Sequence, residues 1–204
     1  WAEVGGDAMA DHADSALILQ LVQGRDREGV KLTACRSAWR PPCERVVSLP
    51  VEVSEALVLL GPEAIGHVGR ALQGEALRQA EYAAVRVRGE DGDLVWQSAK
   101  LLSLSYIHGT NALGEPQICL HDLIFGPARS PGGRWLTFDT GAMHGANTEN
   151  RRTLGEVLVR SCAAVGLDVR IDLRLAREGG RTARGATVFF GDGQAIAPGQ
   201  APRL

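Results

Sequence analysis

Residues 135–190 read WLTFDTGAMHGANTENRRTLGEVLVRSCAAVGLDVRIDLRLAREGGRTARGATVFF, and this stretch decides the fold that we expect. It has the pattern of a strand, a glycine-rich loop, a helix, an alternating strand, a second glycine-rich loop and a last strand. From Asp168 to Leu175 apolar and charged residues alternate, which indicates a strand with one buried and one solvated face. Such strands are typical of antiparallel sheets. The stretch therefore predicts an α+β fold on a mostly antiparallel sheet.

The helix within this stretch has a signal at both ends. Thr153 and Glu156 fit a capping box, in which each side chain satisfies a backbone N–H of the first turn. Gly166 followed by Leu167 fits a left-handed C-terminal cap. We therefore expect a helix over about 154–165, with Leu154, Val157, Leu158, Cys162 and Val165 on its apolar face.

A second main helix is expected over about 62–80. Pro62 suits the first helical position, and Glu63 suits the positive end of the helix dipole. Ile65, Val68 and Leu72 then recur at three- and four-residue steps. The glycines of this helix often mark close packing against a neighbour. Residues 54–60 fit a helical turn and a buried strand equally well.

The remaining strands are expected mainly as hairpins, which build the sheet. Apolar runs separated by polar turns predict one hairpin in the first 40 residues and another around the Asp91-Gly92 turn. Pro50 marks an edge or the end of a further strand. The expected strands are residues 16–23, 30–37, 45–53, 83–88, 94–108 and 117–126, and residues 127–134 form a turn.

One domain is the simplest organisation. Residues 1–14 are rich in Gly, Ala and Asp and predict an extended arm, and residues 15–204 predict a single α+β domain. The best candidate for a weak seam inside it lies near residues 109–116.

Composition and charge indicate an ordinary globular protein. The 204 residues are 45% hydrophobic and 23% charged, which excludes a disordered chain. A net charge of −2 and a pI near 6.2 give no overall electrostatic case for nucleic acid or an anionic membrane, although a local Arg-rich face is possible. No apolar run approaches the roughly 20 residues of a membrane-spanning helix, so we expect a soluble protein that binds no membrane.

The four cysteines favour a reduced, cytoplasmic protein. Cys119 lies in a strand-like run and Cys162 on the apolar face of a helix, so both are expected as buried free thiols. Cys35 and Cys43 flank a Trp and two prolines, and a loop disulfide between them stays open. The sequence has no CxxC pair, so a structural zinc site has no support.

Two loops are candidate ligand-binding sites. The loop over 139–152 precedes a helix and carries Asp139, His144 and Asn147, followed by Arg151 and Arg152. Backbone N–H groups at a helix start, together with arginines, suit an anion such as phosphate, but a polar helix cap has the same composition. The loop over 177–185, with Arg181 and Arg184, is the second candidate.

The five histidines give no local metal signature. None pairs at HxH or HExxH spacing, and we expect neither a metal nor a cofactor. The one metal site that the sequence leaves open is assembled at long range from His108, His121 and His144. His121 and Asp122 are adjacent in an expected strand, so they face opposite sides.

One short likeness to a known family is present. The run Tyr106-Ile-His-Gly-Thr-Asn111 resembles the histidine motif of ADP-ribosyltransferases, and residues 132–138 resemble the aromatic strand that follows it. The resemblance implies that His108 contacts the ribose of NAD. It covers about ten residues, and no glutamate occupies a convincing third motif.

Two functional hypotheses follow. Because no coherent catalytic set is present, the main one is a non-catalytic subunit or interaction module of a larger assembly, binding a protein partner or a second copy of the chain through exposed hairpin edges. The alternative is an enzyme acting on a nucleotide or phosphorylated ligand, with His108, His144 and Asp139 as catalytic candidates. NAD processing like that of ADP-ribosyltransferases is one form of this alternative.

Overall fold

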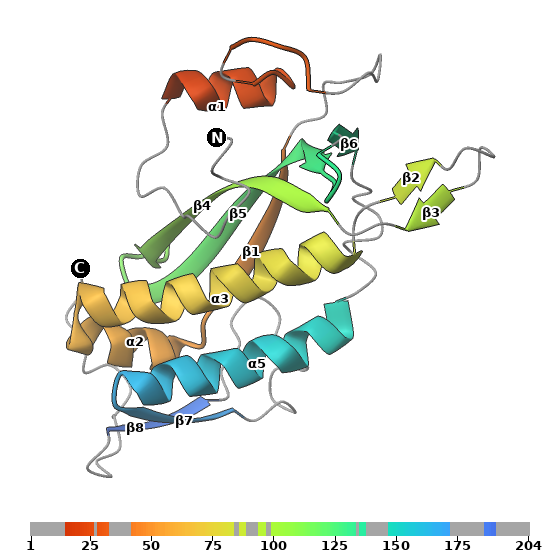
Figure 1. Cartoon of the computed structure of the whole chain (residues 1–204). Helices are drawn as coiled ribbons and strands as arrows, with labels where there is room; N and C mark the ends of the chain where they lie inside the picture. Colours follow the sequence, from red (N-terminus) through yellow and green to blue (C-terminus); the bar gives the residue numbers. More distant parts are fainter. Residues whose placement is uncertain are drawn as a thin grey trace. The chain divides into compact units, whose positions relative to one another are not determined.

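A computed structural model describes residues 15–26, 28–32, 42–83, 86–88, 94–96, 99–133, 135–137, 147–171 and 186–190. It confirms an α+β fold with an antiparallel sheet (Figure 1). The described helices are α1 (Ser15–Val22), α2 (Val51–Leu60), α3 (Pro62–Ala83) and α5 (Asn147–Ala164). The described strands are β1 (Cys43–Ser48), β2 (Arg86–Arg88), β3 (Leu94–Trp96), β4 (Lys100–Thr110), β5 (Pro116–Arg129), β6 (Trp135–Thr137), β7 (Leu167–Ile171) and β8 (Ala186–Phe190).

The main sheet has the order β1-β5-β4, and β6 pairs with the end of β5. The short strands β2 and β3 form an antiparallel ribbon, and so do β7 and β8. Strand β5 is central, so it has a hydrogen-bonded neighbour on each side.

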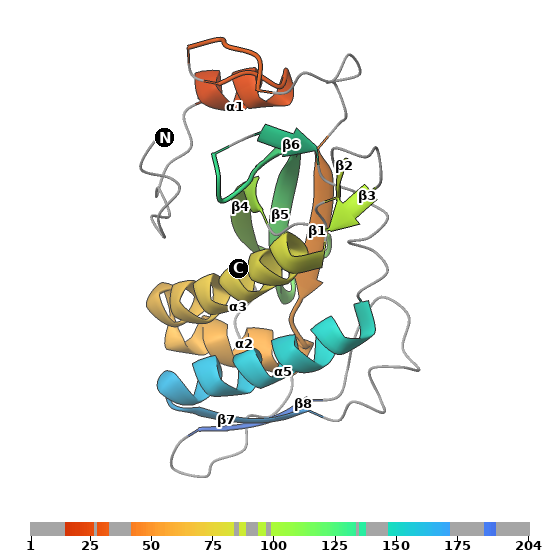
Figure 2. The ribbon, with the colours of Figure 1, turned by 45° about the vertical axis from the view of Figure 1, so that its right-hand side comes forward.

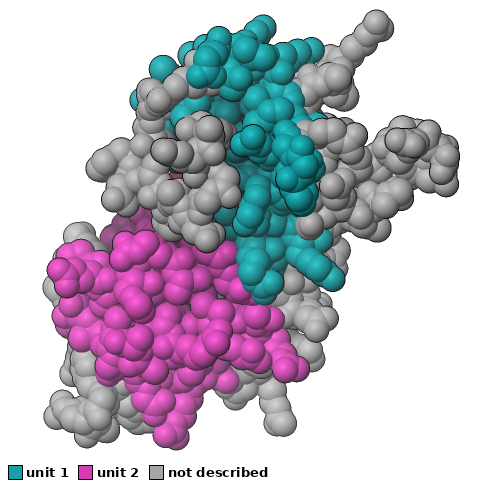
Figure 3. Space-filling view, in the orientation of Figure 1, with its two compact units in different colours: residues 1–45, 77–104, 122–147 teal, residues 46–76, 105–121, 148–204 magenta. Residues whose placement is uncertain are grey.

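The chain divides into two compact units (Figure 3). Unit 1 comprises residues 1–45, 77–104 and 122–147, and unit 2 comprises residues 46–76, 105–121 and 148–204. Helix α3 and strands β1, β4 and β5 each contribute residues to both units. The expectation of one domain over 15–204 stays a prediction, and the expected arm over 1–14 lies outside the described residues.

The core of unit 2 lies between its part of the sheet and its helices. In Figures 1 and 2, α5 lies between α2 and the β7–β8 ribbon. The most buried side chains of this core come from α2, α3, β5, α5 and β7, and include Val53, Leu57, Val68, Leu72, Ile118, Leu120, Cys162 and Leu167. Burial raises the pKa of the Cys162 thiol to about 12, so this thiol stays protonated and inert at neutral pH.

Helix α3 approaches the sheet of unit 2 most closely at Gly69. A Cβ atom at this position would overlap Cδ1 of Ile107 on β4 and lie 3.5 Å from Cδ2 of Leu120 on β5. The expected role of helix glycines in close packing is therefore confirmed at Gly69. It does not extend to Gly74, where an added Cβ would meet nothing within 4 Å.

A buried serine ties α2 to β5. The hydroxyl of Ser54 donates to the carbonyl of Pro50 at 3.0 Å, and the backbone N–H of Ile118 donates to the same hydroxyl oxygen at 3.0 Å. Leu49 N also donates to the carbonyl of Ile118 at 2.9 Å. These bonds tie β5 to α2 and to the residue that follows β1, and they satisfy polar groups that burial would otherwise leave unpaired.

Unit 1 has two separate apolar clusters. In one, the last turns of α3 pack on the sheet through Ala80, Leu101 and Ile124. In the other, α1 packs through Leu21 against Leu102 and Phe125.

The structure corrects the first expected hairpin, because residues 16–23 lie in helix α1 rather than a strand. The run contains no Gly or Pro and is rich in Leu, Ala and Gln, which favour helices. It ends where Gly24 adopts a φ of 69°. The partner strand over 30–37 lies partly outside the described residues. The undecided residues 54–60 belong to α2.

The structure also corrects the start of the helix expected over 154–165. Helix α5 begins at Asn147, so Thr153 lies inside it and cannot be its N-cap. Glu156 instead accepts a bond from Arg152 at 3.1 Å, one turn earlier. The C-terminal cap is confirmed, since Gly166 has a φ of 85°.

Most other expected elements are confirmed with shifted boundaries. Helix α3 extends the expected 62–80 to Ala83, and β7 pairs with β8 as expected. The strand expected over 45–53 is only partly confirmed, because β1 ends at Ser48 and residues 51–53 lie in helix α2. Strand β5 runs to Arg129, so the expected turn over 127–134 begins later. Cys119 and Cys162 are buried free thiols, and Cys43 is also free. None of the described helices is long and apolar enough to cross a membrane.

The close approach at Gly69 makes a testable difference between two glycines of one helix. Gly69→Ala is expected to lower the free energy of unfolding by about 1–3 kcal/mol, because Ile107 must leave its packed position. Gly74→Ala is the matched control and should raise it by up to about 1 kcal/mol through helix propensity. Urea unfolding measures both, and a Gly69→Ala protein as stable as the control would contradict the packing described here.

Candidate functional site

Two histidines and a tyrosine share one face of the sheet in unit 2. Side chains alternate along a strand, and Ile107, Ile118 and Leu120 point into the core of this unit. Their neighbours Tyr106 and His108 on β4, and Cys119 and His121 on β5, therefore lie on the opposite face. Tyr106 is 42% exposed, His108 is exposed and His121 is half-buried.

The two imidazole rings contact each other directly. Nε2 of His108 lies 2.9 Å from Nε2 of His121, and the ring centroids are 4.9 Å apart with the planes tilted by 38°. A hydrogen bond of this length needs one proton between the two nitrogens. The pair is therefore a two-nitrogen centre that holds a single shared proton.

The backbone determines which nitrogen carries the proton. Nδ1 of His108 lies 3.0 Å from the carbonyl oxygen of Thr110. A carbonyl only accepts, so Nδ1 of His108 is the donor, and in the neutral ring Nε2 presents its lone pair. His121 then donates from its Nε2–H.

Tyr106 orients the second histidine. Its ring is stacked on that of His121, with centroids 4.7 Å apart and planes 10° from parallel. The carbonyl of Tyr106 accepts a bond from Nε2 of the buried Gln73 on α3 at 3.2 Å. Helix α3 thus supports the strand from the core side while the tyrosine ring supports His121 on the open side.

The turn between β4 and β5 sets the position of both histidines. The side-chain oxygen of Asn111 accepts from the backbone N–H groups of Leu113 at 2.9 Å and Glu115 at 3.0 Å. Its Nδ2 donates to the Glu115 carboxylate at 2.9 Å, and Gly114 adopts a φ of 76°. Asparagine in such a role builds a tight turn locally, so the hairpin geometry is encoded within five residues.

Cys119 lies two residues before His121 on the same face. Its Sγ is 3.3 Å from Oγ of Ser48 on β1, and the residue is buried. The thiol and hydroxyl therefore occupy the side of the site nearest β1.

The histidine pair can supply two ligands to a metal ion. Two nitrogens bound 2.0–2.1 Å from one ion at a right angle lie about 2.9 Å apart, which matches the pair. The bond from Nδ1 of His108 to a backbone carbonyl is also typical of a metal-binding histidine. Within the described ranges, however, no third His, Cys, Asp or Glu completes a group that could hold a metal. The histidine pair could therefore fill two coordination positions of a metal ion, and the described residues do not supply the others.

Among the residues named from the sequence as candidates for a site, His108 and His121 belong to this face. Asp139, His144, Arg181 and Arg184 lie outside the described residues, so the long-range set with His144 stays a prediction. Asn147 and Arg151 lie in the first turns of α5. Arg152 is exposed and pairs with Glu156; its expected ligand role also stays a prediction.

His108 and His121 are expected only as members of a long-range set with His144, and their direct contact is not predicted. The sequence does contain a signal for this contact. Once Ile107 and Leu120 are assigned to the core, strand alternation places both histidines on the other face of one hairpin. The expectation that His121 and Asp122 face opposite sides agrees with their burial, since Asp122 is only 1% exposed.

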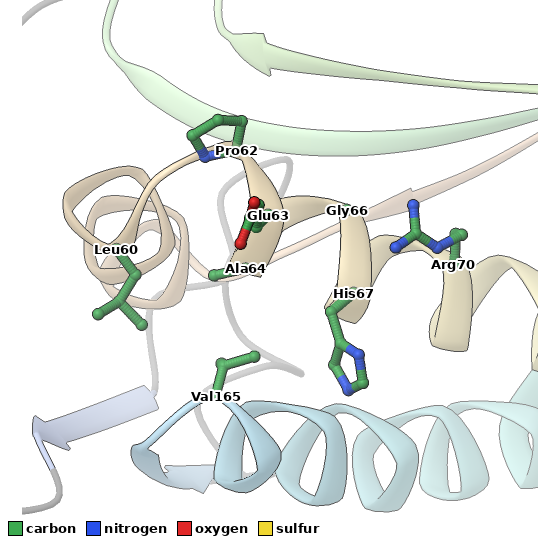
Figure 4. A pocket seen from close by; sticks show the side chains of 8 residues that line it. All are labelled: Leu60, Pro62, Glu63, Ala64, Gly66, His67, Arg70 and Val165. Atoms are coloured by element: carbon green, nitrogen blue, oxygen red, sulfur yellow. The ribbon is translucent and has the colours of Figure 1, made fainter.

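Unit 2 also has a cavity, which lies away from the histidine face and is lined mainly by residues at the start of α3. It has a volume of about 760 Å³, and in Figure 4 His67 points from α3 toward α5, near Val165. Glu63 and Arg70 also line it and contribute opposite charges. This cavity has no excess charge and no pair of contacting side chains like His108 and His121. The His108–His121 face is therefore the stronger candidate for the functional site.

Neither a protein-family model nor a curated protein sequence matches the chain. Solved structures of similar fold include those of the conjugative relaxase TrwC. One in complex with oriT DNA, copper-bound, has a TM-score of 0.69 at 20% identity over 85% of this chain and 60% of that chain. A metal-bound complex with oriT DNA has 0.68 at 21% over 85% and 61%. A complex with a 27-mer DNA comprising the recognition hairpin and the cleavage site has 0.65 at 21% over 84% and 62%.

These structures correct the main functional expectation. The chain shares its fold with relaxases solved in complex with DNA. This finding contradicts the expectation of a non-catalytic interaction module or complex subunit. It also contradicts the expectation that nucleic acid is not indicated as a partner. The alternative, an enzyme acting on a nucleotide or phosphorylated ligand, is better supported, while its ADP-ribosyltransferase form stays a prediction. The chain spans only about 60% of the length of these relaxase chains.

The turn at Asn111 gives a prediction about the site's framework. Asn111→Ala removes the acceptor of two backbone N–H groups and should lower the free energy of unfolding by about 1–3 kcal/mol. Asn111→Asp combined with Glu115→Gln keeps that acceptor without placing two carboxylates against each other, and it should cost less. Urea unfolding gives both values, and nuclear Overhauser effects between the rings of His108 and His121 report the pair. Equal losses in the two variants, or none, would contradict the role of the Asn111 side chain.

Proposed function

We propose that this chain binds a DNA strand on the open sheet face of unit 2, as part of a DNA-processing enzyme, with a phosphodiester held at the His108–His121 pair. The observation that carries the proposal is this exposed pair of imidazoles in a fold shared with DNA-bound relaxases. The shared fold by itself supports no particular substrate, so the chemistry of the face must make the case.

The pair suits a phosphate in two ways. When a phosphate oxygen approaches, the Nε2–H of His121 can turn its donation from His108 to that oxygen. Nε2 of His108, released from that bond, then presents its lone pair as a hydrogen-bond acceptor beside the phosphate. The Thr110 carbonyl keeps His108 in the required tautomer, and the Tyr106 ring keeps His121 in place. The site is thus prepared before a ligand binds.

A divalent ion would be held by His108 and His121. When bound, it supplies a Lewis acid that polarises a phosphate oxygen. The described part of the chain contributes two nitrogens to such an ion. Binding and orientation of the strand are therefore the roles that we assign to these residues themselves.

The net charge of −2 does not oppose this proposal. Net charge averages over the whole surface, whereas a strand is attracted by the field at the place where it binds. We also propose a cytoplasmic location, as the cysteine usage suggests.

Binding of a labelled oligonucleotide tests the proposal. With a 5′-fluorescein pool of 20-nucleotide single strands and hairpins carrying a single-stranded tail, we expect saturable binding by the wild-type chain. His108→Ala and His121→Ala should each weaken it about 5- to 30-fold, as expected for the loss of about 1–2 kcal/mol of hydrogen bonding. Fluorescence anisotropy measures the dissociation constants.

His67→Ala is the matched control, because His67 is an exposed histidine of the same unit that lies on α3 and away from the open sheet face. It should bind DNA like the wild type. Failure of the wild-type chain to bind any member of the pool would overturn the proposal. An equal loss in the His67 variant would show that the effect is not specific to the pair.

A further inference from the structure

A second cavity, entirely within unit 1, combines basic and aromatic side chains. It has a volume of about 560 Å³, within the range of sites for small ligands. Its walls come from the last turns of α3, the start of β4 and the turn after β5. The lining residues include Arg78, Glu81, Tyr82, Lys100, Arg129 and Ser130.

The charge of this cavity is opposite to that of the whole chain. Three of its side chains are basic and one is acidic, a net charge of +2 in a chain of net charge −2. The acidic one, Glu81, is largely committed to the protein. One carboxylate oxygen lies 3.1 Å from Nζ of Lys100, and the other accepts from the backbone N–H of Leu101 at 3.1 Å. The cavity therefore favours an anion.

Arg129 is the last residue of β5, and Trp135 holds it in position. It lies directly across from Trp135 in the antiparallel pairing of β5 with β6, and its guanidinium carbon is 5.8 Å from the centre of the Trp135 ring. Such cation–π contact orients the guanidinium without neutralising it. Lys100 extends from the start of β4 with 64% of its side chain exposed, so it can reach a ligand while keeping Glu81 as a neighbour.

Tyr82 supplies an uncovered aromatic ring beside these charges. It is 83% exposed, although large aromatic side chains are usually at least half covered. An exposed ring next to cations is the combination that binds unpaired nucleotides, in which the base stacks and the phosphate meets the positive charge. A paired base has both of its faces covered by neighbours in the duplex, so this arrangement selects single-stranded DNA.

We propose that the unit 1 cavity binds an unpaired nucleotide of a DNA strand, with the base on Tyr82 and the phosphate between Lys100 and Arg129. The inference rests on the proposed function for the class of ligand. It adds a separate contact, on different residues and in a different unit from the histidine pair.

Binding to 5′-fluorescein-(dT)20 tests this contact. Tyr82→Ala is expected to weaken binding about 5- to 100-fold, as loss of one stacked base does elsewhere, and Tyr82→Phe should restore it. Arg129→Ala should weaken binding and make its salt dependence less steep, because one phosphate contact is lost. Arg160→Ala, an exposed arginine on α5, is the control and should bind as the wild type does. Melting temperatures establish that each variant is folded.

Photocross-linking with 5-iododeoxyuridine distinguishes this inference from the proposed function. Tryptic peptide 79–86 contains Tyr82, whereas peptide 101–129 contains Tyr106, His108 and His121. Cross-links in peptide 79–86, lost in Arg129→Ala, support the cavity. Cross-links confined to peptide 101–129, with wild-type binding by the Tyr82 and Arg129 variants, overturn the cavity and leave the histidine site standing. Cross-links confined to peptide 79–86, with wild-type binding by the His108 and His121 variants, overturn the histidine site and leave the cavity standing. A chain that binds no oligonucleotide overturns both proposals.

Discussion

The contact of α3 with the sheet at Gly69 is the constraint on which the arrangement of unit 2 depends. Only glycine leaves room for Ile107 to lie against the helix backbone, because an added Cβ would overlap its Cδ1. This packing commits one face of β4 and β5 to the core. Because strand side chains alternate, it also commits Tyr106, His108 and His121 to the other face. A shift of either strand by one residue would bury the histidines and expose the apolar residues, so packing in the core determines where the polar site lies.

The open face is prepared by groups that do not touch a ligand. Asn111 closes the hairpin, the Thr110 carbonyl fixes the tautomer of His108, and the Tyr106 ring holds His121. None of these bonds is individually strong, since exposed hydrogen bonds typically contribute about 1 kcal/mol each. Their shared effect is geometric. They hold two imidazole nitrogens at a distance that suits a shared proton, a phosphate oxygen or two positions of a metal ion, and a flexible loop would not.

The sequence predicts those parts of the fold that local patterns determine. Helix α3 follows from Pro62 and the spacing of Ile65, Val68 and Leu72, and the alternation after Asp168 gives β7. Prediction failed where one pattern fits two structures. The apolar run of α1 suits a strand as well as a helix, and the Thr153–Glu156 spacing of a capping box also occurs inside a helix. The histidine pair depends on strand pairing across the turn at Asn111, and a net charge conceals a local basic cavity such as the one in unit 1.

Contact between the histidine pair and DNA is measured most directly by NMR of the imidazole nitrogens. In a chain labelled with ¹⁵N-histidine, adding a single-stranded oligonucleotide should shift the ring signals of His108 and His121 and leave those of His67 unchanged. The same titration, followed by anisotropy, shows when the DNA is bound. Bound DNA with unchanged signals from His108 and His121 would contradict a strand lying on this face.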